Sequence, residues 1–192
     1  MNRVGVGRML VASLHQGISD LIPTRLDFYE NWLNPAGMRN GKIGLAPLAA
    51  VLSFLRQEGD PYTLVTERAG KYAADWTFEN LSSMERSVIR AMPVWVRTRL
   101  AMRLAKQVVE RTYRGSRASA KLRRGEGTLT LRNSVFCAVR EPFGWPLCVY
   151  YSAALTRLLT LVDVEGTARV GSCQGLGDQT CTIAVTVPQH QK

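Results

Sequence analysis

Histidine is nearly absent from this chain of 192 residues, which contains only His15 and His190. His15 falls in a predicted helix and His190 in a polar tail, and neither is close in sequence to a candidate nucleophile. We therefore interpret both as structural or surface residues. The sequence also lacks a Walker loop, a G-x-S-x-G motif, an H-E-x-x-H motif and a Rossmann fingerprint. Without a recognisable hydride source, the chain is not expected to act as an autonomous reductase.

A long hydrophobic run is missing as well. The longest apolar stretch, 43–55, is too short to cross a bilayer and is interrupted by Pro47. The apolar run at 9–14 is shorter than a secretory signal requires. We therefore predict a cytoplasmic protein without a membrane span. Thiols stay reduced in that compartment, which disfavours disulfides.

Acidic residues are outnumbered, with 15 Asp and Glu against 25 Lys and Arg, and the net charge is +10. The excess is concentrated at 90–124, where Glu110 is the single acidic residue. Three interpretations stay open. The arginines can form a solvated helix face whose stems cover the edge of the core. They can instead contact an anionic ligand or an acidic partner through Arg97, Arg103 and Arg111. Nucleic-acid binding is the weakest interpretation, because aromatics are sparse there and no helix-turn-helix pattern occurs.

Apolar periodicity predicts an α+β fold in which a helical N-terminal half packs on a small antiparallel sheet. Helices are expected at 6–21, 24–33, 45–57, 61–79, 94–114 and 146–162, and a further helix is expected to begin at the capping box of Ser82. Thr24 is the expected N-cap of the second helix, and Pro146 is expected to begin the last one. The strands are expected at 119–123, at 128–132 with an extension through Val135 and Phe136, at 167–173 and at 181–187. Residues 1–40 are predicted to be an N-terminal helical segment, and 41–188 a separate domain.

All four cysteines lie in the last third of the chain, at Cys137, Cys148, Cys173 and Cys181. Cys173 and Cys181 close a C-x7-C loop between two predicted strands. Facing residues of a hairpin have β-carbons about 5 Å apart, within reach of one metal ion or a disulfide. The spacings differ from the C-x2-C pairs of common zinc ribbons. A metal site, inert buried cysteine and redox chemistry therefore remain as alternatives.

Three segments carry a resemblance to a known family. They are NSVFC at 133–137, PLCVYY at 146–151, and CQGLGDQTC at 173–181 followed by an alternating strand. Over 133–185 they resemble the 4-vinyl reductase (V4R) domain. That family includes a stand-alone protein of bacteriochlorophyll biosynthesis and the sensor domains of aromatic-responsive activators. The resemblance implies a fold like the TRAPP and NO-signalling ligand-binding domains over 41–188. It also implies a homodimer or a protein partner, and an apolar ligand pocket.

The resemblance further implies a structural zinc ion. In the sensor members, cysteines matching Cys148, Cys173 and Cys181 hold the ion together with a glutamate. The position of that glutamate is Val170 here, and valine cannot bind a metal. Either Cys137 supplies the fourth thiolate, or the site is incomplete.

The implied function is binding of a small hydrophobic or tetrapyrrole-like molecule by a carrier, chaperone or sensor, with (bacterio)chlorophyll biosynthesis as a possible setting. The alternatives are a vinyl reductase acting on divinyl tetrapyrroles, and nucleic-acid binding through 90–124. Phe143 and Trp145 are expected either to wall the pocket or to pin their loop to the core. The candidate pocket residues are Leu52, Leu55, Phe143, Trp145, Tyr150 and Tyr151.

Overall fold

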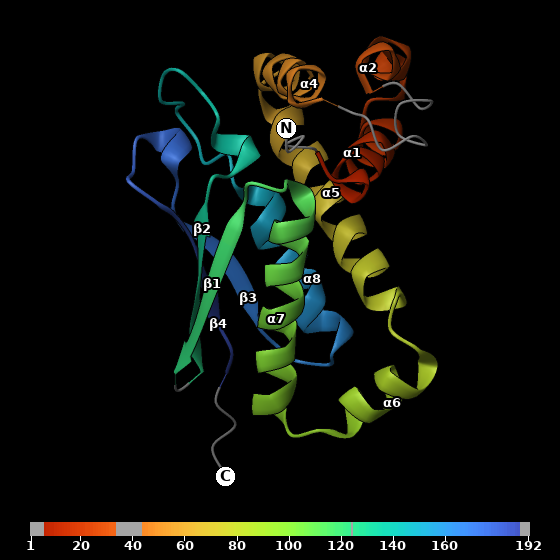
Figure 1. Cartoon of the computed structure of the whole chain (residues 1–192), viewed down its shortest axis with the longest axis vertical. Helices are drawn as coiled ribbons and strands as arrows, with labels where there is room; N and C mark the ends of the chain where they lie inside the picture. Colours follow the sequence, from red (N-terminus) through yellow and green to blue (C-terminus); the bar gives the residue numbers. More distant parts are fainter. Residues whose placement is uncertain (1–5, 34–43, 124, 189–192) are drawn as a thin grey trace.

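The computed structural model describes residues 6–33, 44–123 and 125–188, and places helices on one side of a small sheet (Figure 1). The seven α-helices of the described residues are α1 (Arg8–Leu21), α2 (Leu26–Leu33), α4 (Leu45–Gln57), α5 (Asp60–Glu79), α6 (Ser83–Ala91), α7 (Val94–Thr112) and α8 (Val149–Leu161). The strands are β1 (Arg117–Arg123), β2 (Glu126–Arg132), β3 (Thr167–Ser172) and β4 (Cys181–Thr186). They form one antiparallel sheet in the order β1-β2-β4-β3. The predicted α+β architecture is confirmed.

The helices form layers behind one face of the sheet. α7 packs on β1 and β2, and α8 packs on β3. α5 lies behind α8, and α1 packs on α5 (Figure 1). Along β2, Leu129 and Leu131 are buried while Thr128 is exposed, so the strand turns its apolar side chains toward the helices. The core therefore lies between the sheet and the helical layers.

Two expectations about helix starts have different outcomes. The capping box is confirmed, since the Ser82 N–H donates to Glu85 Oε2 at 2.7 Å and the Glu85 N–H donates to Ser82 Oγ at 3.2 Å. Thr24, however, does not cap α2. It lies inside a short 3-10 turn, η1 (Pro23–Arg25), and α2 begins directly after that turn.

Two expectations about 133–148 are wrong. Val135 and Phe136 do not extend β2 but belong to a 3-10 turn, η2 (Val135–Cys137). Asn133 turns the chain there, because its φ of 56° is a left-handed conformation that asparagine tolerates. α8 begins at Val149 and not at Pro146. The backbone of Leu147 is engaged elsewhere, with its N–H on the Cys173 sulfur and its carbonyl on the Tyr62 hydroxyl.

No helix in the described ranges is long and apolar enough to cross a membrane, in agreement with the prediction. The predicted boundary at residue 40 falls within 34–43, outside the described residues, so the division into two parts stays a prediction. Leu14 and Ile18 of α1 and Tyr29 of α2 join the same buried apolar cluster as the later helices.

The contact between α5 and α8 depends on Gly70, and replacing it tests the packing. A β-carbon at Gly70 would lie 2.2 Å from the Tyr150 carbonyl oxygen, which is backbone and cannot turn aside. We expect Gly70→Ala to lower the free energy of unfolding by about 1–3 kcal/mol, the usual cost of overpacking. Gly144→Ala is the matched control, because nothing lies within 4 Å of its β-carbon position. Chemical denaturation measures both, and equal stabilities would contradict the packing described.

Candidate functional site

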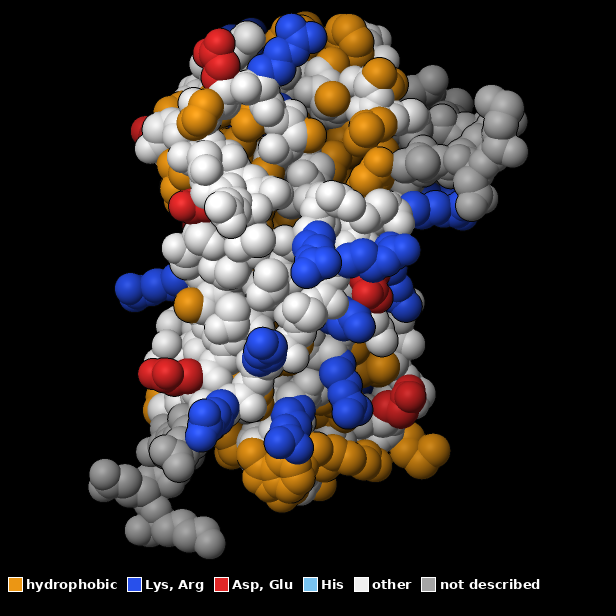
Figure 2. All heavy atoms as spheres, turned by 60° about the vertical axis from the view of Figure 1, so that its left-hand side comes forward, with side chains coloured by type: hydrophobic (Ala, Val, Ile, Leu, Met, Phe, Trp, Pro, Cys, Tyr) orange, Lys and Arg blue, Asp and Glu red, His pale blue; other side chains and the backbone are white. Residues whose placement is uncertain are grey.

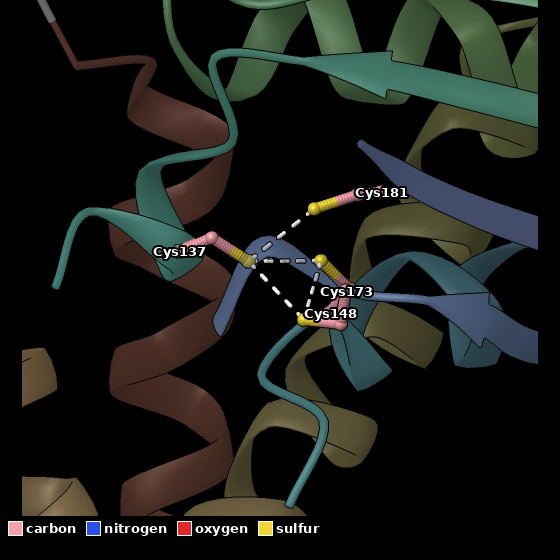
Figure 3. Close-up of side chains that lie close together, drawn as sticks. All are labelled: Cys137, Cys148, Cys173 and Cys181. Atoms are coloured by element: carbon pink, nitrogen blue, oxygen red, sulfur yellow. Dashed lines mark hydrogen bonds between the residues drawn. The ribbon is translucent and has the colours of Figure 1, made fainter. Parts of the chain in front are cut away.

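The four cysteines converge from four separate segments (Figure 3). Cys137 ends η2, Cys148 precedes α8, Cys173 follows β3, and Cys181 begins β4. The Cys137 sulfur lies 3.1 Å from that of Cys148, 3.4 Å from that of Cys173 and 3.5 Å from that of Cys181. All four sulfurs lie within 4.8 Å of one another. Cys137 therefore joins the other three cysteines in one cluster, whereas Val170 lies within β3.

The donor set fits a metal ion. All four cysteines are free; Cys148, Cys173 and Cys181 are buried, and Cys137 is half-buried. A tetrahedral ion with metal–sulfur bonds of about 2.3 Å separates its ligand sulfurs by about 3.8 Å. Four of the six sulfur separations are 3.1–3.6 Å, close to that value and well above a disulfide bond of about 2.05 Å, and the other two are within 4.8 Å. Small outward movements of the side chains would complete a tetrahedral thiolate site.

Backbone amides also point at the sulfurs. The Leu147 N–H donates to Cys173 Sγ, and the Gln174 N–H donates to Cys181 Sγ, each at 3.3 Å. Asp178 holds the loop between them, since its carboxylate accepts the Cys173 N–H at 2.8 Å. Gly177 makes the return turn with φ of 97°, a conformation that favours glycine. The Leu147 and Gln174 N–H groups stabilise negative charge on the sulfurs, so they favour thiolates over neutral thiols.

The sulfurs shift one another's ionisation strongly. Hydrogen bonds from Cys137 first, then from Cys148 and Cys181, hold the pKa of Cys173 well below its usual value. A hydrogen bond with Cys137 raises the pKa of Cys148 and also that of Cys181. A hydrogen bond with Cys148 lowers the pKa of Cys137 as well, so two of the four thiols ionise more easily and two less easily than a free thiol. A bound cation would favour ionisation of all four.

Arg56 provides a second sign that this region is anionic. Only 6% of its surface is exposed, and within the described residues it has no carboxylate partner. Its Nη1 donates weakly to the Phe136 carbonyl at 3.4 Å, and its guanidinium lies 5.6 Å from the centre of the Phe143 ring. Burial lowers the pKa of Arg56, whereas the charges of Tyr62 and then of Cys137 raise it. Buried charges are normally paired, and Cys137, directly after Phe136, would be a counter-charge when ionised.

An aromatic cluster lies beside the sulfurs. Phe136 stacks on Tyr150 with ring centres 4.9 Å apart, and contacts Tyr151 edge to face at 5.4 Å. The Tyr150 hydroxyl lies 3.4 Å from Ser13 Oγ. The Tyr151 hydroxyl is buried and makes no hydrogen bond of good geometry in the described part of the chain, although Ser134 is near enough to lower its pKa. Burial raises the pKa of Tyr151 well above its usual value, so the hydroxyl keeps its proton and can donate a hydrogen bond.

The predicted pocket residues fall into separate groups. Phe143 and Trp145 pack edge to face at 5.5 Å, and Trp145 is 37% exposed. Tyr150 and Tyr151 lie in the aromatic cluster, and Leu52 and Leu55 are fully buried in α4. The α4 helix meets the loop at the contact of Arg56 with Phe143. Ligand binding by these residues stays a prediction.

The predicted anion-contact arginines occupy different environments. Arg97 donates through Nη1 to the carbonyls of Val162 and Asp163, at 3.0 and 2.8 Å, and so binds the end of α8. Arg103 is exposed in the first half of α7, whereas Arg111 is exposed in its last turn. Contact of these three residues with an anion or a partner stays a prediction.

Sequence reasoning missed Arg56 and Phe136. A signal for Arg56 was present, because it follows Leu52 by four residues in a strongly apolar helix and so lies on the core face. The sequence pattern predicts a strand at Phe136, so it does not indicate that Phe136 lies in the turn beside Cys137.

The comparisons with known proteins identify a fold. No protein family and no curated protein sequence matches the chain. Among solved structures, it is similar to the H-NOX domain of Shewanella oneidensis in the Fe(II)CO ligation state, with a TM-score of 0.59 and 10% identity over 97% of this chain and 99% of that one. It is also similar to the phenol-responsive sensory domain of the transcription activator PoxR with phenol, with a TM-score of 0.52 and 16% identity over 77% and 76% of the two chains. The chain thus has the fold of sensory ligand-binding domains.

Metal content tests the sulfur cluster. We expect protein purified under reducing conditions to hold about one thiophilic divalent ion per chain, and Cys148→Ser and Cys173→Ser to hold much less, since three thiolates bind more weakly than a closed set of four. At free metal a hundredfold above Kd, binding should raise the free energy of unfolding by about 2.7 kcal/mol. Elemental mass spectrometry and melting with and without chelator measure both. Metal-free protein with the same melting temperature would contradict a metal site.

Arg56→Met tests the buried counter-charge. Losing the cation should weaken metal binding by about 10–100-fold, as neighbours of metal ligands often do. The metal-free form should also lose some stability, because the buried Phe136 carbonyl loses its donor. Competition with a chromophoric chelator measures the affinity. Arg169→Met, an exposed arginine on β3, is the matched control. Equal metal affinities in the unmodified protein, Arg56→Met and Arg169→Met would show that Arg56 does not contribute to metal binding.

Proposed function

We propose that this chain is the ligand-binding domain of a small-molecule sensor or carrier, in which a structural zinc ion fixes the ligand-binding region. The observation that carries the proposal is the unpaired Tyr151 hydroxyl, buried among aromatic rings beside the four thiols. A buried hydroxyl without a partner costs about 1–3 kcal/mol, which a bound ligand with a polar group would recover.

Zinc is the proposed ion because four thiolates match its preference for sulfur in closed tetrahedral sites. Bound there, zinc would join η2, the start of α8 and the β3–β4 loop into one unit. Phe136 precedes Cys137, and Tyr150 and Tyr151 follow Cys148, so the ligand-facing rings would be fixed by the same ion. The metal's role is structural, and this chain's aromatic side chains would contact the ligand.

The proposed ligand class follows from the side chains around the Tyr151 hydroxyl. Phe136 and Tyr150 offer apolar rings that would have to part to admit a ligand, and Tyr151 offers one hydrogen-bond donor. This combination suits a small aromatic molecule with one polar group, which is the chemistry that PoxR senses in phenol. We also propose that the chain belongs to the 4-vinyl reductase domain family and forms a homodimer. A more specific form of the proposal is a tetrapyrrole-like ligand and a role in bacteriochlorophyll biosynthesis.

Phenol and toluene together test the role of Tyr151. We expect phenol to bind and toluene, which has nearly the same shape without the hydroxyl, to bind about tenfold more weakly. Tyr151→Phe should remove the difference between the two ligands without destabilising the free protein, because it deletes an unpaired hydroxyl. Calorimetric titration and melting measure these quantities. Tyr72→Phe, at a half-buried tyrosine of α5 whose hydroxyl donates to Asp20 at 2.6 Å, is the control for loss of a paired hydroxyl, and it should leave binding of both ligands unchanged.

Two outcomes would contradict the proposal. If Tyr151→Phe unfolds more easily and binds both ligands as before, the hydroxyl is structural. If native mass spectrometry finds a divinyl tetrapyrrole that is converted when a reductant is supplied, the chain is a reductase and not a carrier or sensor.

A further inference from the structure

A second candidate binding region lies at the other end of α7 from the thiols. It is a groove of about 620 Å³ lined by residues of α6 and of the first half of α7. These two helices are joined at the lower end of the molecule in Figure 1. The lining is mainly apolar and includes Met84, Val88, Ile89, Met92, Trp95 and Leu100. Met84 is 76% exposed and Trp95 is 60% exposed. Large apolar side chains concentrated in a groove commonly mark a binding site.

A basic hollow adjoins this groove. It has a volume of about 200 Å³ and lies between α7 and β1, where Arg99 and Arg103 meet Lys121. Arg99 and Arg103 line both the groove and the hollow. Figure 2 shows the same arrangement on one face, with hydrophobic side chains gathered at the lower end of the molecule and Lys and Arg side chains above them.

The cations of the hollow are available to a ligand. Within the described residues, Arg99, Arg103 and Lys121 form no ion pair, whereas Arg90 pairs with Asp163 and Lys106 with Glu110. The Arg99 guanidinium lies 5.1 Å from the centre of the Trp95 ring. Glu85, the one acid lining the groove, is engaged by the Ser82 N–H at 2.7 Å.

We propose that the α6–α7 groove and the adjoining hollow bind a single amphiphilic anion, with its apolar chain in the groove and its carboxylate at Arg99, Arg103 and Lys121. The charge complementarity selects this occupant. If a second copy of the chain docked here, Arg99 and Arg103 of one copy would face those of the other. Each copy has a net charge of +10, so this contact is unfavourable. The groove volume lies in the range of small-molecule sites, about 300–1,000 Å³. The site uses no thiol, so it stands apart from the function proposed above.

Sodium decanoate below its micelle concentration is the probe, with decanol as the neutral analogue and acetate as the isolated head group. We expect one decanoate per chain by calorimetric titration. Decanol should bind about tenfold more weakly, because a charge-assisted contact is lost. Acetate should show no binding, because the apolar contact supplies most of the affinity. Added salt should weaken decanoate binding and leave decanol unchanged.

Single substitutions locate the site. Arg99→Gln and Arg103→Gln should each weaken decanoate binding by about tenfold, while decanol binding is unchanged. Val88→Asp, at an exposed groove position, should abolish binding of both. Arg111→Gln is the matched control, because it removes the same charge from the last turn of α7, and Arg111 lines neither the groove nor the hollow. Thermal melting verifies that each variant is folded.

Three results would overturn the inference. An equal loss in Arg111→Gln would show that net charge, and not this site, attracts the anion. Unchanged affinity in Val88→Asp would place the apolar chain elsewhere. If monomeric decanoate does not bind but phosphatidylglycerol vesicles retain the protein through Arg99 and Arg103, the surface binds membranes and not a single amphiphile.

Discussion

The convergence of four sulfurs is the constraint on which the C-terminal half depends. Cys137 and Cys181 are 44 residues apart in sequence, yet their sulfurs lie 3.5 Å apart. The segments that carry the thiols are mostly turns and loops, with few ladder hydrogen bonds of their own. A metal ion held by the four thiols would supply the cross-links that such segments lack, and its binding energy would become folding energy.

The helical half supports that arrangement through buried polar contacts. The Tyr62 hydroxyl of α5 donates to the Leu147 carbonyl at 2.9 Å, directly before Cys148. Arg56 of α4 reaches the Phe136 carbonyl, directly before Cys137. α5 and α4 thus each hold the backbone next to one thiol through a buried polar side chain. Leaving such a buried group without a hydrogen-bond partner would cost free energy. The position of the sulfurs is therefore determined by long-range contacts as well as by the hairpin.

α7 and α8 separate two regions of different chemistry. At one end, sulfur and aromatic side chains are buried and close-packed. At the other, Trp95 and Met84 are exposed beside unpaired arginines. Arg99, Arg103 and Lys121 thus lie away from the thiols, whereas Arg56 is buried next to the turn that carries Cys137.

The sequence by itself determined most of the secondary structure, because helix and strand periods and the capping box at Ser82 are local signals. It also identified the four cysteines, and it ruled out a glutamate ligand at Val170. It failed at Asn133 and at Pro146, where a left-handed residue and the tertiary bonds of Leu147 decide the chain path. Only the tertiary structure brought Cys137 to the other sulfurs, placed Arg56 and Phe136 beside them, and separated Arg97 from Arg103 and Arg111. Those outcomes depend on contacts between residues far apart in the chain, which local patterns do not encode.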